Sequence, residues 1–211
     1  MEFKHTPVLL AQTVDGLNIR PDGIYVDCTA GGGGHSFAIA EKLSKTGRLI
    51  ALDRDPDAIM AAGARLAEFP NAAVIHRNYS EIDSVLDELG IGGVDGILMD
   101  LGVSSHQLDE ESRGFSYHSD APLDMRMSQS GMSAADLVNT FDEQQLAKII
   151  FEYGEEKFSR RIASTIPPTT SASALTRSRS AFHAASMRPA HSFRYCVGNC
   201  AISLLCQVTS A

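Results

Sequence analysis

Four successive glycines, Gly31 to Gly34, separate an apolar run at 24–30 from a helical pattern at 35–45. A short apolar run that ends at glycines is typical of a buried strand. Glycine tolerates backbone conformations that other residues avoid, and it lets the main chain approach a ligand closely. The feature therefore predicts a strand, a tight turn and a helix, the unit from which parallel α/β sheets are built.

The same alternation of strand and helix continues toward the middle of the chain. Further strands are expected at 48–53, 72–76 and 94–99, and the intervening helices at 55–69, begun by Asp55 and Pro56, and from Ser80 to just before Gly90. This spacing predicts an α/β fold with a Rossmann-like parallel sheet and right-handed crossovers. Ligands of such sheets bind at the carboxyl ends of the strands.

The glycine turn lacks two familiar phosphate-binding patterns. A dinucleotide motif needs a third glycine, but the corresponding positions hold Ser36 or Phe37. The turn also lacks the lysine and hydroxyl pair of a triphosphate loop. A nucleoside ligand without a pyrophosphate, such as S-adenosylmethionine, fits better. The alternative is a tight turn that binds no ligand.

Two further residues follow strand ends. Asp53 closes the second strand, where a carboxylate can accept hydrogen bonds from both ribose hydroxyls; alternatively it caps a helix or is solvated. Tyr79 follows the third strand and could stack on adenine, or it could be an aromatic residue at the rim of the core. Both interpretations stay open for each residue.

Beyond the fourth strand the pattern changes. Residues 101–132 read as a long loop with few helix signals, and helices return at 133–139, 142–153 and 155–166. From Pro167 onward the composition turns to Ser, Ala, Thr and Arg without an apolar period.

Charge is distributed unevenly around a net charge of −8. Residues 1–156 hold 11 basic and 26 acidic residues, whereas the remainder holds 7 basic and no acidic ones. The acidic body argues against broad, nonspecific binding to nucleic acid. No apolar run is long enough to span a bilayer, and the first residues lack the features of a signal peptide, so a cytoplasmic protein is expected.

The four cysteines do not form a recognisable metal site. Cys28 lies in the first strand pattern and is expected to be a small buried residue. Cys196, Cys200 and Cys206 lack a fourth ligand and a CxxC pair, so we expect no zinc.

The long loop carries the most specific pattern of the chain. Residues 100–109, 113–117 and 120–127 closely resemble the ribosomal RNA small subunit methyltransferase H family, also called MraW. Shorter stretches agree with this resemblance, namely 5–10, 33–36, 53–56 and 153–158. The resemblance covers residues 4 to about 166.

The resemblance implies a Rossmann-like methyltransferase sheet, here incomplete, with the start of a helical substrate domain. It implies S-adenosylmethionine as the cofactor and methylation of the exocyclic amino nitrogen of a cytidine in 16S rRNA of the small ribosomal subunit. The residues that would bind the cofactor are Gly33, Gly34, His35, Asp53, Tyr79, Asp100 and Gln107.

Asp100 is also the candidate catalytic residue. The lone pair of an aromatic amino group is delocalised into the ring, so an acceptor for the amino protons would help the nitrogen to attack. Asp100 could instead touch only the cofactor. Ser104, Ser105 and residues 120–126 are candidates for cytosine and phosphate contacts. Alternatively this loop folds on itself, with Asp124 and Arg126 among its ion-pairing residues.

The chain is expected to comprise a cofactor domain at 1–107, a substrate loop with a partial helical domain at 108–166, and an atypical tail at 167–211. Members of the resembled family continue well past residue 166 with motifs absent here. The tail is therefore expected to be disordered or read out of frame, and the chain to be inactive on RNA. The alternatives are a fragment that at most binds S-adenosylmethionine and another nucleic-acid amino-methyltransferase.

Overall fold

The computed structural model describes residues 9–116 and 120–166. The expectations for the tail at 167–211, including its three cysteines, lie outside these ranges. The chain forms two compact units with a division after Leu101, and each unit is described by itself. No helix in the described ranges is long and apolar enough to cross a membrane.

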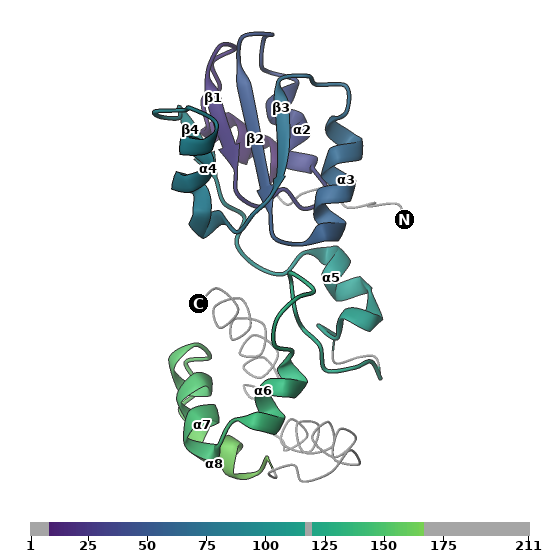
Figure 1. Ribbon diagram of the computed structural model, residues 1–211, viewed down its shortest axis with the longest axis vertical. Helices are drawn as coiled ribbons and strands as arrows, with labels where there is room; N and C mark the ends of the chain where they lie inside the picture. Colours follow the sequence, from purple (N-terminus) through teal and green to yellow (C-terminus); the bar gives the residue numbers. More distant parts are fainter. Residues whose placement is uncertain (1–8, 117–119, 167–211) are drawn as a thin grey trace. The chain divides into compact units, whose positions relative to one another are not determined.

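The first unit is built on a four-stranded parallel sheet (Figure 1). Its strands are β1 (Ile24–Asp27), β2 (Arg48–Asp53), β3 (Ala72–His76) and β4 (Gly96–Leu98). Their order is β3-β2-β1-β4, with parallel pairing throughout. The chain thus moves outward from β1 to β3 and then returns to the other side of β1. This reversal of strand order is the point at which open α/β sheets bind ligands.

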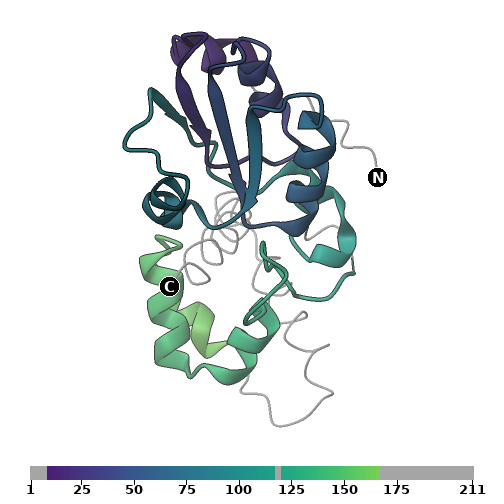
Figure 2. The ribbon, with the colours of Figure 1, turned by 45° about the horizontal axis from the view of Figure 1, so that its top comes forward.

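Alternate residues of the central strands supply two apolar layers. Tyr25, Leu49 and Ala51 pack on one face, against helices α1 (Leu10–Gly16), α2 (Gly34–Ala40) and α3 (Pro56–Leu66). Val26, Ile50 and Leu52 pack on the other face, with side chains of α4 (Ile82–Glu88). Figure 2 shows this arrangement of helices around the sheet. The predicted parallel α/β fold is confirmed by the parallel pairing of all four strands. Helices cover both faces of the sheet, as a parallel sheet requires.

Local signals set several helix ends. Asp55 caps α3 as expected, accepting a hydrogen bond from the Asp57 amide at 3.1 Å. The cap predicted at Ser80 is wrong. Asn78 instead begins a short 3-10 helix, η1 (Tyr79–Glu81), with a reciprocal capping box to Glu81. The predicted helix at 35–45 ends at Ala40, and α1 was not predicted.

The second unit contains α5 (Ser105–Asp109), η2 (Glu111–Arg113), α6 (Ala134–Thr140), α7 (Glu143–Glu152) and α8 (Ser159–Ser164). Ser133 and Asp142 cap α6 and α7, close to the predicted boundaries. The last helix begins at Ser159, later than predicted. Glu155 has a φ of 51°, which an α-helix cannot include.

The expectation of a loop with few helices at 101–132 is wrong in its first part, which forms α5 and η2. Helix α5 begins at a capping box. The Ser104 hydroxyl accepts a hydrogen bond from the Gln107 amide at 3.2 Å, and the Gln107 side chain accepts one from the Ser104 amide at 3.1 Å. A serine followed three residues later by glutamine is the sequence signal for this motif, so the helix could have been recognised.

Candidate active site

The glycine turn connects β1 to α2. Gly31 and Gly33 have φ values of 50° and 76°, in the left-handed region that favours glycine. A Cβ atom on Gly33 would lie 3.1 Å from Cα of Ala62 in α3. Gly33 is therefore required both by its backbone conformation and by the close packing of the turn on a neighbouring helix.

Asp53, at the end of β2, holds this turn. Its Oδ2 accepts a hydrogen bond from the Gly31 amide at 2.9 Å, and its Oδ1 accepts one from the Asp55 amide at 2.9 Å. Burial raises the pKa of Asp53, while these amide donors act to lower it. The Arg54 backbone also donates to this carboxylate. A carboxylate has about four acceptor positions, which leaves room for a hydrogen bond from the ribose. The helix-capping role belongs to Asp55 instead.

Asp27, at the end of β1, is a site residue that the sequence analysis missed. Its side chain is fully buried, and Oδ2 accepts a hydrogen bond from the Ser36 hydroxyl at 2.6 Å. Oδ1 accepts the Thr29 amide at 3.0 Å and faces the Thr29 hydroxyl at 3.4 Å. Burial is the main cause that raises the pKa of Asp27. The available signal was a carboxylate within the apolar run between Val26 and Cys28, since an unsupported buried charge is costly.

His35, in the first turn of α2, is a buried polar residue with an unmet hydrogen-bonding need. It is 6 % exposed, and within the described residues its Nε2 atom has no hydrogen-bond partner. A buried polar atom without a partner costs about 1–3 kcal/mol. A polar ligand at the glycine turn could offset that cost, so this atom fits the predicted role of His35 in cofactor binding.

Tyr79 and Asp100 follow the ends of β3 and β4. Tyr79 begins η1 and is 36 % exposed, which leaves its ring available to a ligand. Asp100 is exposed, and its amide donates to the Thr29 hydroxyl at 2.8 Å. The carboxyl ends of the four strands thus carry the glycine turn, Asp53, Tyr79 and Asp100, as predicted. Among the residues that the structure describes, no group of His, Cys, Asp or Glu could hold a metal ion.

Gln107 belongs to the second unit, where it is buried and completes the capping box of α5. Its backbone and side chain both bond to Ser104, so the capping role accounts for these contacts. Its predicted contact with the cofactor stays a prediction.

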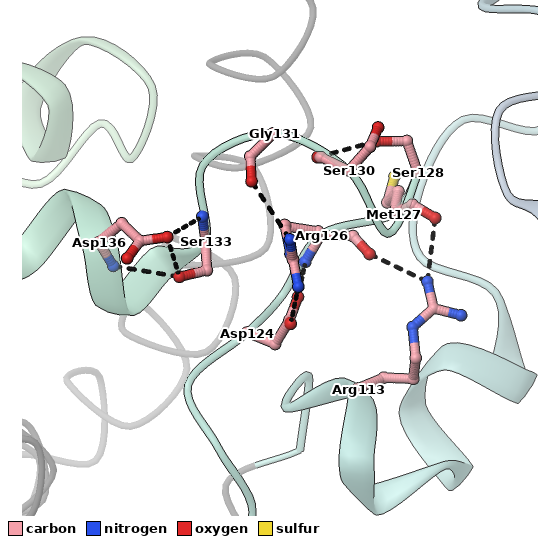
Figure 3. Close-up of polar contacts among 9 residues, drawn as sticks. All are labelled: Arg113, Asp124, Arg126, Met127, Ser128, Ser130, Gly131, Ser133 and Asp136. Atoms are coloured by element: carbon pink, nitrogen blue, oxygen red, sulfur yellow. Dashed lines mark hydrogen bonds and ion pairs between the residues drawn. The ribbon is translucent and has the colours of Figure 1, made fainter.

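The loop that follows η2 is held by two arginines (Figure 3). Arg126 donates from Nε and Nη2 to the two carboxylate oxygens of Asp124, at 2.9 and 2.6 Å, and from Nη1 to the Gly131 carbonyl at 3.2 Å. The hydrogen bond from Arg126 lowers the pKa of Asp124. The alternative in which Asp124 and Arg126 are among the ion-pairing residues of a loop that folds on itself agrees with this pair.

Arg113, at the end of η2, bonds to the backbone of the same loop. It is 7 % exposed, and its Nη2 donates to the carbonyl oxygens of Arg126 and Met127, at 3.0 and 2.9 Å. The same loop contributes side chains to an apolar cluster of the second unit. The buried members of that cluster are Phe115, Met125, Met127, Ala134, Leu137 and Ile149. The described part of the loop therefore packs into an apolar core of the second unit.

Residues 2–189 match the model of the MraW methylase family. The chain belongs to this family. The match reaches beyond residue 166, where the sequence analysis ended the resemblance. The methylase family accords with a glycine turn and acidic residues at the carboxyl ends of a parallel sheet.

Curated relatives agree with the family. A protein of Clostridium botulinum (strain Kyoto / Type A2), named ribosomal RNA small subunit methyltransferase H, is 60 % identical over 164 residues, 77 % of this chain and 53 % of the relative. Relatives of the same name occur in Lachnospira eligens, 58 % identical over 168 residues, and, numbered 2, in Agathobacter rectalis, 59 % identical over 169 residues. They cover 79 % of this chain, and 53 % and 54 % of their own lengths.

The chain thus spans about half the length of the curated relatives that it matches. A solved rRNA methylase from Streptococcus thermophilus matches 40 % of this chain and 50 % of its own, with 22 % identity and a TM-score of 0.32. That score is too low to bear on the fold.

Proposed function

We propose that this protein transfers a methyl group from S-adenosylmethionine to the exocyclic amino group of a cytidine in 16S rRNA of the small ribosomal subunit. The observation that carries the proposal is the match of residues 2–189 to the MraW methylase family. It is supported by curated relatives named ribosomal RNA small subunit methyltransferase H. Such a substrate would place the protein in the cytoplasm.

The first unit offers the groups that this cofactor needs. Asp53 would accept hydrogen bonds from the ribose hydroxyls, and Tyr79 would stack on the adenine. The backbone of Gly33 and Gly34 would lie against the ligand. The Nε2 atom of His35, which has no partner among the described residues, would bond to the methionine part of the ligand. When bound, S-adenosylmethionine supplies an electrophilic methyl group on a sulfonium.

Asp100 would act on the nucleophile. Its exposed carboxylate can accept hydrogen bonds from the amino protons of cytosine, which localises the nitrogen lone pair and disperses charge as the methyl is transferred. Attack by a cysteine is the usual route to methylation of ring carbon five. Cys28 is a poor candidate for that route, because it is 3 % exposed and burial raises its pKa to about 11.

The contacts of Asp53 suggest how to test the cofactor. Calorimetric titration of the full chain with S-adenosylmethionine should show saturable binding, and Asp53→Asn should weaken it by about 1–3 kcal/mol. Asp83→Asn, on the exposed side of α4, is the matched control and should bind like the unchanged chain. Binding unchanged by Asp53→Asn would contradict the ribose assignment. Saturable binding of NADH would contradict the choice of cofactor.

The reaction is tested separately with small-subunit RNA. Assembled subunits should accept methyl groups better than short naked RNA, because the acidic body provides few phosphate contacts. Mass spectrometry should locate the methyl on the cytosine amino nitrogen, and Asp100→Ala should abolish transfer. A methyl on ring carbon five would refute the amino-group chemistry. Binding of the cofactor without transfer would instead favour a chain that only binds S-adenosylmethionine.

A further inference from the structure

Thr29 lies two residues beyond β1 and bonds to both of its acidic neighbours in the site. Its hydroxyl accepts a hydrogen bond from the Asp100 amide at 2.8 Å and lies 3.4 Å from Oδ1 of Asp27. Its amide donates to the same oxygen at 3.0 Å. A hydroxyl has one donor and two acceptor positions, so it can donate to Asp27 while it accepts from Asp100.

Asp27, to which the Thr29 hydroxyl bonds, is itself held firmly in place. Its carboxylate is fully buried at the end of a central strand, and its other oxygen accepts the hydroxyl of Ser36 in α2 at 2.6 Å. A carboxylate packed in this way has little freedom to move. One buried group therefore fixes the start of α2 and, through Thr29, the backbone at Asp100.

Asp100 needs such a connection because it lies past the end of the sheet. The residue pairing between β1 and β4 ends at Asp27 and Leu98, and the next bond is donated by the Cys28 amide to the Leu98 carbonyl at 2.9 Å. Asp100 is two residues further on, and its side chain is exposed. The hydroxyl of Thr29 continues the connection between the two strand ends beyond the sheet.

We propose that Thr29 is a positioning residue, which transmits the fixed position of Asp27 to the main chain of Asp100. The inference rests on the proposed function, in which the Asp100 carboxylate meets the cytosine amino group, and on the predicted contact of Asp100 with the cofactor. A displacement of about 1 Å at a reacting group can cost a hundredfold in rate. The hydrogen bond from the Asp100 amide would keep the carboxylate within that tolerance.

The experiment compares Thr29→Val, which keeps the side-chain shape but loses the hydroxyl, with Thr29→Ser, which keeps the hydroxyl. Amide hydrogen exchange of the full chain should be faster at Asp100 in Thr29→Val and near its original rate in Thr29→Ser. Calorimetry with S-adenosylmethionine should show an affinity about 3- to 10-fold weaker for Thr29→Val, the cost of one hydrogen bond. Thr29→Ser should restore the affinity.

A double-mutant cycle separates positioning from general stability. In an Asp100→Ala background, Thr29→Val should weaken binding by less than about 2-fold, because residues that act through each other are not additive.

Three results would overturn the inference. The first is an amide exchange rate at Asp100 that Thr29→Val leaves unchanged. The second is a loss of affinity for S-adenosylmethionine that Thr29→Ser fails to restore. The third is an equal loss of affinity in Thr29→Val with and without the Asp100 side chain. Failure of the unchanged chain to bind S-adenosylmethionine would contradict the proposed function and the inference together. Binding by the unchanged chain that Thr29→Val leaves intact would contradict the inference alone.

Discussion

The glycine turn of the first unit and the arginine-held loop of the second, residues 113–116 and 120–133, are fixed by side chains of opposite charge. Around the turn, the carboxylates of Asp27 and Asp53 accept hydrogen bonds from backbone amides. In the loop, the guanidinium groups of Arg113 and Arg126 donate to backbone carbonyls. Both arrangements satisfy main-chain groups that have no partner in a helix or sheet.

The two regions differ in the direction in which the pKa values of their aspartates are shifted. Burial raises the pKa of both aspartates at the turn, whereas Arg126 lowers the pKa of Asp124 in the loop. A guanidinium group stays protonated at all ordinary pH values. We therefore expect acid to stabilise the carboxyl groups of the turn and to weaken the ion pair of the loop. The stability of the loop should then depend more on its packing than that of the turn.

The largest effect is expected for Gly114→Ala in the loop. A Cβ atom there would lie 2.2 Å from the Pro122 carbonyl oxygen, and the φ of 72° already disfavours alanine. We expect a loss of about 3 kcal/mol or more in the free energy of unfolding. Gly131→Ala is the matched control, because its φ of 79° is similar but no atom of residues 9–116 or 120–166 lies within 4 Å of the added Cβ. It should cost about 1–2 kcal/mol.

Urea denaturation followed by circular dichroism would measure both variants, and Gly33→Ala extends the comparison to the glycine turn. Its Cβ would lie 3.1 Å from Ala62 Cα, between the other two cases. The loss in unfolding free energy for Gly33→Ala should therefore fall between the losses for Gly131→Ala and Gly114→Ala. Equal costs for Gly114→Ala and Gly131→Ala would show that the loop does not pack as closely as described.

A smaller loss is expected when Arg113 is replaced by methionine. The variant keeps much of the buried stem but leaves the carbonyls of Arg126 and Met127 without their donor. We expect the unfolding free energy to fall by about 2–3 kcal/mol. Amide exchange at 122–133 should rise more than exchange in the first unit. Arg65→Met, in the exposed last turn of α3, is a control that should change little. Faster exchange throughout the chain would contradict a local role.

Asp27→Asn is expected to cost about 1–2 kcal/mol, and the cost should depend on pH. The raised pKa of Asp27 means that its contribution is fully present below the unfolded pKa, about 4. That contribution is lost as pH rises through the raised folded value. The difference in stability between the unchanged chain and Asp27→Asn should therefore be larger at acid pH than at neutral pH. Denaturation in buffers from pH 4 to 8 would measure it, and the opposite trend would contradict the buried environment.

Asp124→Asn should show the reverse dependence with a smaller amplitude. The lowered pKa of Asp124 means that its pairing with Arg126 is fully effective above about pH 4 and is lost as pH falls through the folded value. The side chains are 27 and 29 % exposed, so we expect about 1 kcal/mol at neutral pH. The cost should vanish in acid. A cost that persists at pH 2–3 would point to packing instead of the ion pair.

Hydrophobic pattern predicted the fold of the first unit because its strands are short apolar runs between glycine-rich or polar turns. The bounds of β2 and β3 agree with the prediction. The error at Ser80 arose from competing caps, since Asn78 forms a capping box with Glu81 and its side chain also accepts a hydrogen bond from the Ser80 amide. Helix α5 was not predicted because its five residues are too few to show an apolar period, and its sequence signal is the capping pair of Ser104 and Gln107.

The site was less predictable from the sequence. Asp53 and Asp100 could be placed at strand ends by counting along the chain, but counting does not show which backbone amide an aspartate accepts. Asp27 was missed because it lies inside an apolar run, and only the fold reveals that Ser36 and Thr29 converge on it. Asp124 and Arg126 could be named as candidate ion-pairing residues of the loop from their charges, but the sequence did not show that they pair with each other.

The smallest effect is expected at Cys28, which lies between the glycine turn and β1. Its thiol is 3 % exposed, and burial, with a further contribution from Asp27, raises its pKa to about 11. The thiolate is the reactive form, so native protein at pH 8 should hardly react with iodoacetamide at this residue. Peptide mapping should find Cys28 modified only after denaturation in urea. Rapid modification of native Cys28, at a rate like that of the unfolded chain, would show that β1 opens readily and that Asp27 is not a fixed support for the turn.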